Sequence, residues 1–291
     1  MRFALFVLLS SGLWAQADPP RKFVCADVTT CEMREQTVEA TGDLSVEGLE
    51  NGPVVVRGWD GAKVLVRLRV EAHAATIGEV QDLFRRIRTV VEPGRVVVDG
   101  PRGLIARGWL VSAEVYVPRA TNLRLETNNG AIEIADLAGN VNTRSHNAAI
   151  QVERIRGNVR AVSNNSAIRV ADVSGDGDFE TNNGAMRFSG IGGSVRGRTN
   201  NGQIELGLVG QGSAGRLVEL ETHNAAVVVT MPRDFSAEVQ FESHHGQLKS
   251  DFPAPPRNKR MDDDIRSFRI GAGAARIHVK TNNGSVKLRA N

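Results

Sequence analysis

The sequence predicts an all-β protein whose C-terminal two-thirds forms a right-handed parallel β-solenoid, or β-helix, with 18-residue rungs. The first observation is an internal repeat. The segment Thr127–Ile134 returns in copies that start at Ser145, Ser163, Thr181 and Thr199, each 18 residues after the last. The other two observations are an alternation of apolar and polar residues within each copy and glycine or asparagine at fixed turn positions. Looser copies start at Thr222, Ser243 and Thr281, and their longer intervals indicate insertions.

Each copy contains a short strand with one buried face. Two apolar columns, two residues apart, run through the repeats: Ile132, Ile150, Ile168, Met186, Ile204 and Ile134, Val152, Val170, Phe188, Leu206. The column between them is polar in every copy, and a period of two is the signature of a strand buried on one side. A further apolar column includes Leu137 and Ile155, and a weaker one is interrupted by Gly177.

Asparagine recurs at the turn of each repeat. The five aligned residues are Asn129, Asn147, Asn165, Asn183 and Asn201. In a solenoid each lies one rung above its counterpart, about 4.8 Å away, so the side chains are expected to form a hydrogen-bonded ladder. A series of β-hairpins is the alternative, because Asn-Gly favours two-residue hairpin turns. A meander does not require identical residues every 18 positions, and the solenoid is therefore preferred.

The region before the repeats is predicted to form a small β-rich cap containing one helix. Within residues 37–120, alternation predicts strands over 64–70, 95–99 and 109–117. Thr76 and Glu79 match a capping box, which predicts a helix over about 76–91 that stops before Pro93-Gly94. We expect this cap to cover the first rung of the solenoid at 121–291. The proline-rich stretch at about 251–266 is predicted to be an exposed loop.

The N-terminus predicts export. Arg2, the apolar run Phe3–Leu9 and Ala15-Gln16-Ala17 match a signal peptide over residues 1–17, although a buried N-terminal strand or helix is the alternative. No later apolar stretch reaches the ~20 residues that a membrane helix needs. In the segment 18–36, Cys25 and Cys31 are expected to form a disulfide in an oxidising compartment, with two free thiols as the alternative.

Charge and motifs argue against several function classes. The net charge is +3, and acidic and basic residues alternate without a basic block, so a nucleic-acid partner is not expected. No nucleophile elbow, phosphate loop or zinc-helix motif is present. The glycine-rich nonapeptide of calcium-binding solenoids is also missing, and no metal or cofactor is predicted. Asp136, Asp172, Asp176 and Asp178 are the candidates for a polysaccharide-active enzyme, although turn formation is the preferred explanation of these aspartates.

Histidines occupy one turn column. His146, His223 and His244 stand where other copies have asparagine, and both residue types tolerate left-handed backbone. Turn formation is therefore the simpler explanation. The sharper hypothesis is a surface transition-metal site made by His223 with His244-His245, which requires their rungs to be adjacent.

The best binding candidates are the polar residues between the two apolar columns. Glu133, Gln151, Arg169, Arg187 and Glu205 are expected to form a row along one solenoid face. The partner is expected to be an envelope protein, a glycan or a second copy of the chain. The shortage of exposed aromatic residues disfavours capture of sugars by stacking.

The chain resembles the DUF4097 family of bacterial adhesin domains. The resemblance spans about residues 38–290 and rests on the segment Asn51–Asp60, the serial Thr-Asn-Asn-Gly motifs, Met231–Ala237, and Gly271-Ala272-Gly273 followed by Thr281–Gly284. It implies a β-solenoid in the cell envelope, either periplasmic or at the surface, and supplies no catalytic residues. We therefore expect non-catalytic binding or scaffolding, with the polysaccharide-active enzyme as the alternative.

Overall fold

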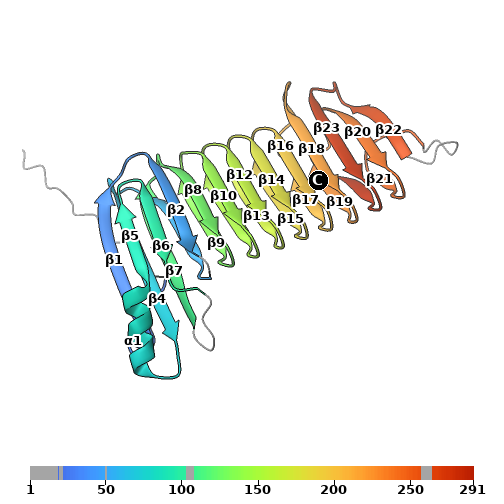
Figure 1. Cartoon of the computed structure of the whole chain (residues 1–291). Coiled ribbons are helices and arrows are strands. Elements are labelled where there is room, and N and C mark those ends of the chain that lie inside the picture. The colour runs from blue at the N-terminus through green and yellow to red at the C-terminus, as the bar shows by residue number, and fades with distance from the viewer. Residues whose placement is uncertain (1–18, 20–21, 50, 103–107, 257–263) are drawn as a thin grey trace, which may run out of the picture.

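The computed structural model of the chain describes residues 19, 22–49, 51–102, 108–256 and 264–291. It is an elongated β-solenoid whose strands lie side by side like the steps of a ladder (Figure 1). Two sheets, each of twelve strands within the described ranges, make up most of its regular structure. The β-solenoid expected from the repeat is thus confirmed. The expected signal peptide, 1–17, lies outside the described residues.

We call the two sheets sheet A and sheet B. In spatial order, sheet A contains β1 (Cys31–Glu39), β4 (Lys63–His73), β7 (Gly108–Pro118), β3 (Val54–Trp59), β9 (Ile132–Leu137), β11 (Ile150–Ile155), β13 (Ile168–Val173), β15 (Met186–Ile191), β17 (Ile204–Gly207), β19 (Val227–Met231), β24 (Val286–Ala290) and β21 (Leu248–Ser250). From the opposite end, sheet B contains β22 (Asp264–Ile270), β20 (Ala237–Ser243), β23 (Ala275–Thr281), β18 (Leu217–Thr222), β16 (Val195–Thr199), β14 (Gly177–Thr181), β12 (Val159–Ser163), β10 (Val141–Ser145), β8 (Asn122–Thr127), β2 (Asp43–Leu49), β6 (Arg95–Asp99) and β5 (Arg88–Glu92).

Each rung gives one strand to each sheet, and the core lies between the sheets. Neighbouring rungs pair in parallel with the register that the repeat predicts, so Ile150 lies between Ile132 and Ile168. These side chains are at most 1% exposed. Each such aliphatic side chain stabilises the fold by about 1.5–3 kcal/mol relative to exposure, so a rung depends on its neighbours for most of its stability.

The repeat geometry begins before residue 121. Strands β2 and β3 form a rung of their own, because β2 pairs in parallel with β8 and β3 with β9. Asn51, in the turn between them, accepts a hydrogen bond from Asn129. This rung falls inside the region expected to form the cap. It is next to the rung of β8 and β9 in space, but β4, α1, β5, β6 and β7 lie between the two rungs in the sequence.

The last rung in the sequence is not the last rung in space. Strands β23 and β24 lie between β18/β19 on one side and β20/β21 on the other. The antiparallel strand β22 then covers the outer edge of β20. The sequence therefore identified Thr281–Gly284 as a rung but gave no indication of its place in the stack.

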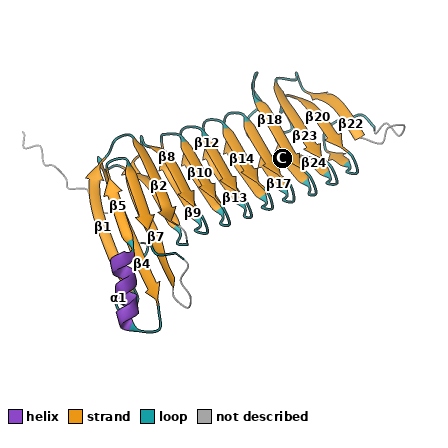
Figure 2. Cartoon of the chain, viewed as in Figure 1, coloured by secondary structure: helices purple, strands orange, loops and turns teal. Residues whose placement is uncertain are grey.

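The cap consists of β1, β4 and β7, which pair in antiparallel fashion, together with the β5–β6 hairpin and the helix α1 (Ile77–Arg86). Its longest strands and the helix project beyond the rungs at the N-terminal end (Figure 2). The capping box of Thr76 and Glu79 is present. The helix is shorter than the expected 76–91, because the chain becomes extended at Ile87 and Arg88–Glu92 pairs with β6 instead.

The expected loop at 251–266 is only partly exposed where the structure describes it. Phe252 is 8% exposed, and Asp264 and Arg266 belong to β22. Residues 257–263 lie outside the described ranges. Among the helices that the structure describes, none has the length and apolar character needed to cross a membrane.

Candidate binding surfaces

The predicted polar row lies on the outer side of sheet A. Glu133, Gln151, Arg169, Arg187 and Glu205 occupy equivalent positions on β9, β11, β13, β15 and β17, each paired with the next across the sheet. Beyond Glu205 the row continues through Val228 on β19, Lys287 on β24 and Lys249 on β21. The two lysines were missed in the sequence because the order of their rungs is not sequential.

The N-terminal segment covers the other end of this row. Lys22 Nζ lies 2.6 Å from Glu133 Oε2, and the Phe23 amide donates to the Glu114 carboxylate. The buried Arg67 donates to the Pro19 carbonyl oxygen and pairs with Glu35 across 3.0 Å. Glu133 is therefore engaged within the chain. The open part of the row begins at Gln151.

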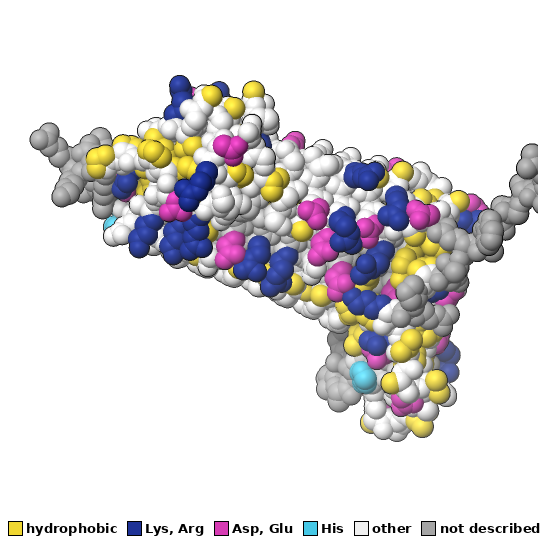
Figure 3. Space-filling model, turned by 180° about the vertical axis from the view of Figure 1, so that it is seen from behind, with side chains coloured by type: hydrophobic (Ala, Val, Ile, Leu, Met, Phe, Trp, Pro, Cys, Tyr) yellow, Lys and Arg dark blue, Asp and Glu magenta, His cyan; other side chains and the backbone are white. Residues whose placement is uncertain are grey.

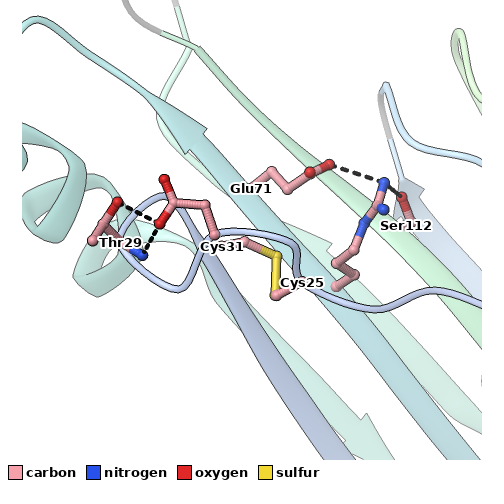
Figure 4. Close-up of a disulfide and its surroundings, with 7 residues drawn as sticks. Cys25, Thr29, Cys31, Glu71 and Ser112 are labelled. Carbon is pink, nitrogen blue, oxygen red and sulfur yellow. Dashed lines mark hydrogen bonds and ion pairs between the residues drawn. A yellow bond between two sulfur atoms is a disulfide. The ribbon is translucent and has the colours of Figure 1, made fainter.

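A disulfide fixes the end of this segment to the cap. Cys25 and Cys31 are bonded, and Cys31 starts β1 (Figure 4). Beside it, Arg69 pairs with Glu71 across 3.0 Å and donates to Ser112, while the Phe23 ring lies 5.4 Å from the guanidinium of Arg69. These contacts hold the segment against the outer side of β4 and β7.

Like charges meet along the open part of the row. Arg169 is directly opposite Arg187, and Lys287 is directly opposite Lys249. Glu205 neutralises only one of these cations, with 2.7 Å between its Oε2 and Arg187 Nε, and raises the pKa of that guanidinium above its usual value. Arg289 also lies on an outward position of β24. Seen from behind, the body of the solenoid carries Lys and Arg side chains along its length, with Asp and Glu among them (Figure 3).

Asp136 and Asp172 occupy positions of irregular backbone and line one hollow of about 760 Å³ together with Arg119 and Arg154. Together with Arg154 they have positive φ angles, 66° at Asp136, 56° at Asp172 and 54° at Arg154, at aligned positions of the neighbouring strands β9, β11 and β13. Asp136 accepts two hydrogen bonds from Arg154, at 2.7 and 3.1 Å, and these lower the pKa of its carboxyl below the ordinary value of 3.8. A carboxyl held ionised in this way is a poor general acid.

Asp178 lies on β14 of the other sheet, and Asp176 lies in the turn just before this strand. Asp178 pairs with Arg160. The side chain of Asp176 accepts a hydrogen bond from the backbone N–H of Ser194. This bond belongs to a second ladder, at a corner of the solenoid, in which a side-chain oxygen of each rung accepts a hydrogen bond from a backbone N–H of the next rung. The accepting residues are Asn122, Asn140, Asn158, Asp176 and Ser194. The 18-residue spacing of this column is visible in the sequence and could have revealed the ladder. The four aspartates thus do not converge on one point.

The asparagine ladder runs along the opposite corner. Asn147, Asn165, Asn183 and Asn201 each donate from Nδ2 to Oδ1 of the preceding asparagine, over 2.7–2.8 Å. The ladder extends to Asn51 at one end, and through Asn224 to Asn283 at the other. Its amides are largely occupied with one another, so its role is structural.

The histidine column does not gather into one site. Because β23 lies between β18 and β20, Asn282 separates His223 from His244, and its Nδ2 is 3.3 Å from His223 Nε2. The adjacency that the metal hypothesis requires is therefore not met. Across the described ranges, no cluster of three or more His, Cys, Asp and Glu side chains is suited to a metal ion.

A groove along one edge of sheet B was missed by sequence reasoning. It has a volume of about 1370 Å³ and follows the edge of sheet B from β2 to β22. One wall is the histidine–asparagine column that begins at Asn128, and the other is a column of alternating charge that includes Glu180, Arg198 and Glu221. Both columns have the repeat spacing, but which columns border a groove depends on how the chain turns between the sheets.

No family model matches the chain, and no curated protein does. Solved structures with a similar arrangement include a "putative cell adhesion protein" of Clostridium sporogenes (9% identity, 90% of this chain, 100% of that chain, TM-score 0.29). Two more come from Parabacteroides distasonis. One is a "putative adhesin" (11% identity, 89% of this chain, 97% of that chain, TM-score 0.39), and the other is a "putative lipid binding protein" (13% identity, 90% of this chain, 95% of that chain, TM-score 0.32). These likenesses are too remote to support an argument about function.

Proposed function

We propose that this is an exported, non-catalytic envelope protein that binds an anionic component of the cell envelope through the outer side of sheet A. The observation that carries the proposal is the pairing of like charges in register, Arg169 with Arg187 and Lys287 with Lys249. Like charges directly opposite each other destabilise a sheet. Residues that break a local folding rule without an evident compensation are often functional.

The surface fits an extended anionic partner better than a small molecule. Arg169 and Lys249 are exposed, Lys287 is partly exposed, and no ion pair is recorded for any of the three within the described residues. A small hollow of about 140 Å³ lies beside Arg169 and Arg187. A flat face with spaced cations suits an acidic polysaccharide or another acidic polymer. The resemblance to the DUF4097 family agrees with such an adhesin-like role.

Co-sedimentation tests the binding. The purified chain is incubated with isolated cell envelopes, with insoluble polygalacturonate and with a neutral glucan, at low and high salt. Retention by envelopes and by the acidic polymer is expected, and it should fall as salt screens the charges. Replacing Arg169 or Lys249 by Gln should weaken binding about five-fold each, since a Lys or Arg near an anionic surface contributes about 1 kcal/mol.

The matched control is Arg124→Gln, which removes the same charge from the outer side of sheet B. Equal loss of binding in this variant would contradict a specific role for sheet A. Sugar released into the supernatant, and abolished by Asp172→Asn or Asp176→Asn, would support the polysaccharide-active enzyme instead. Mass spectrometry of protein recovered from the envelope fraction tests export, because processing after Ala17 is expected.

A further inference from the structure

The outer side of sheet B carries charge in bands that run across the strands. Four successive strands, β14, β16, β18 and β23, each present two outward residues of one sign when His278 is protonated, and the sign alternates from strand to strand. The bands are Asp178 and Glu180 on β14, Arg196 and Arg198 on β16, Glu219 and Glu221 on β18, and His278 and Lys280 on β23. On β20 the equivalent residues are Gln240 and Glu242, and on β12 they are Arg160 and Val162.

Part of this alternation stabilises the chain itself. Arg196 Nε lies 2.8 Å from Glu219 Oε2, and Arg198 Nε lies 3.8 Å from Glu221 Oε2. These side chains are between 32% and 54% exposed, so each pair contributes little in water. The stacking of rungs does not by itself require the charge to alternate from strand to strand. Sheet A is built on the same rungs, yet it places Arg169 opposite Arg187 and Lys287 opposite Lys249.

We infer that the outer side of sheet B is a self-association surface, on which two copies of the chain pack face to face and antiparallel. The inference is independent of the proposed function, which concerns sheet A. It rests on charge complementarity between this face on one copy and the same face on a second copy related by a two-fold axis. A two-fold axis along the strand direction, midway between β16 and β18, reverses the order of the rungs and keeps each column opposite itself.

Under that axis every charged band meets the opposite sign. Arg196 and Arg198 of one copy lie over Glu219 and Glu221 of the other. The β14 band lies over His278 and Lys280, and β12 lies over β20, which brings Arg160 opposite Gln240 and Val162 opposite Glu242. Histidine adds to the β23 band when it is protonated. Four of the six strands in the contact thus face a strand of opposite charge, and the remaining pair, β12 and β20, brings Arg160 to Gln240.

Other arrangements of two copies are less favourable. An axis along the solenoid places each rung over itself, so every band would meet its own sign. Moving the transverse axis by one rung toward the N-terminus places Arg144 over Lys280. Like charges brought together in an interface cost several kcal/mol, which disfavours both of these arrangements.

The shape and size of the face fit a weak dimer. The strands of the body run side by side with little rotation from one to the next (Figure 1), and the face is hollowed by the groove along Glu180, Arg198 and Glu221 and by a second hollow of about 810 Å³ along Asp178, Arg196 and Glu219. Six rungs about 4.8 Å apart, with five-residue strands rising about 3.3 Å per residue, offer on the order of 500 Å² per copy. The total, on the order of 1,000 Å², is typical of transient interfaces, so association should depend strongly on salt.

Charge reversal in trans tests the inference. In one variant Glu219 and Glu221 are replaced by Arg, and in the other Arg196 and Arg198 are replaced by Glu. Each variant alone brings like bands together at the centre of the dimer. Mixed in equal amounts, the two variants restore an opposite sign at both central contacts. Because the repulsion inside each chain is unchanged by mixing, rescue reports only the contact between copies.

Sedimentation velocity at low salt is the measurement, with circular dichroism to verify folding. The wild-type chain should form a dimer that dissociates at high salt. Each variant should weaken dimerisation at least ten-fold, and the mixture should return to within about three-fold of the wild type. A wild-type chain that stays monomeric, variants that dimerise normally, or a mixture without rescue would each overturn the inference. If a double variant fails to fold, E221R and R198E test the same contact.

Discussion

Asn283 donates from its Nδ2 to Oδ1 of Asn224 across 2.8 Å, although 59 positions separate the two residues. The contact exists because the C-terminal rung of β23 and β24 is inserted between the rung of β18 and β19 and the rung of β20 and β21. A chain end is usually the part of a domain that frays. Here the last strand has a parallel neighbour on each side, which should make it as stable as the interior of the solenoid.

The first prediction compares Leu288 with Leu220. Both side chains are 1% exposed, but Leu288 is close to the C-terminus and Leu220 is in the middle of β18. Replacing either by Ala should lower the free energy of unfolding by about 2–5 kcal/mol, since both changes leave a cavity in packed core. Urea denaturation followed by circular dichroism measures both. A cost below about 0.5 kcal/mol for Leu288→Ala alone would show that the last strand frays.

Equal spacing was enough to predict the rungs from Thr127 to Leu206, because each residue there stacks on its counterpart. Spacing identifies a rung but not its neighbours, so the inserted position of β23 could not be derived. The early rung of β2 and β3 was missed for the same reason, since its partner β8 follows only after the cap. Strand order depends on which edges remain free when each segment pairs, and a sequence period carries no such information.

A second prediction concerns the asparagine ladder. Asn165 has two ladder partners, since it donates to Asn147 and accepts from Asn183, whereas Asn51 accepts only from Asn129. Asn165→Ala should lower the free energy of unfolding by about 1–3 kcal/mol, and Asn51→Ala should lower it by about half as much. Both values should fall near the lower limit of their ranges, because the side chains are exposed. The shift in urea midpoint measures both. A larger effect at Asn51 would indicate that the ladder contributes little and that turn geometry dominates.

The candidate surfaces were predicted less completely than the fold. The row from Glu133 to Glu205 was found because it lies between two apolar columns. Its covering by Lys22 and Phe23 could not be derived, since that contact joins residues about 100 positions apart without any repeat. The charge bands of sheet B had the required spacing in the sequence. They become visible only when the order of the strands, with β23 between β18 and β20, is known.

A third prediction explains why Gly177 interrupts an apolar column. A Cβ at Gly177 would lie 2.4 Å from the Phe179 ring, which stacks on Phe188 at 4.4 Å between centroids. The two rings fill the volume that a valine would otherwise occupy. Gly177→Val should therefore destabilise by about 1–3 kcal/mol through overpacking, although it restores the repeat. Phe179→Ala should cost about 3–5 kcal/mol.

The double variant, with both changes, is the decisive comparison in this core. Valine at 177 should partly fill the cavity that Phe179→Ala leaves, so the double variant should lose less stability than the two single variants together. Chemical denaturation of all four proteins gives the coupling. Strict additivity would show that the two positions do not share one space.

The last prediction concerns Asp136, whose carboxyl has a lowered pKa. Hydrogen bonds from Arg154 are the main cause, burial acts against them, and the charges of Arg154, Arg119 and Arg57 lower the pKa further. A carboxyl with a lower pKa in the folded state stabilises the fold above its unfolded pKa. That contribution is lost as the pH falls through the folded value. Stability from this pair should thus be complete above about pH 5 and decline in more acidic solution.

Arg154→Gln tests the assignment of the cause. The pKa of Asp136, followed by NMR titration of its carboxyl carbon, should rise in the variant, but only in part, because Arg119 and Arg57 remain. The variant should also lose less stability on acidification than the wild type, since less proton-linked free energy is stored in the pair. Arg160→Gln, which removes an arginine paired with Asp178 on the other sheet, is the matched control. An unchanged Asp136 titration in Arg154→Gln would show that the ion pair with Arg154 does not set the acidity of the Asp136 carboxyl.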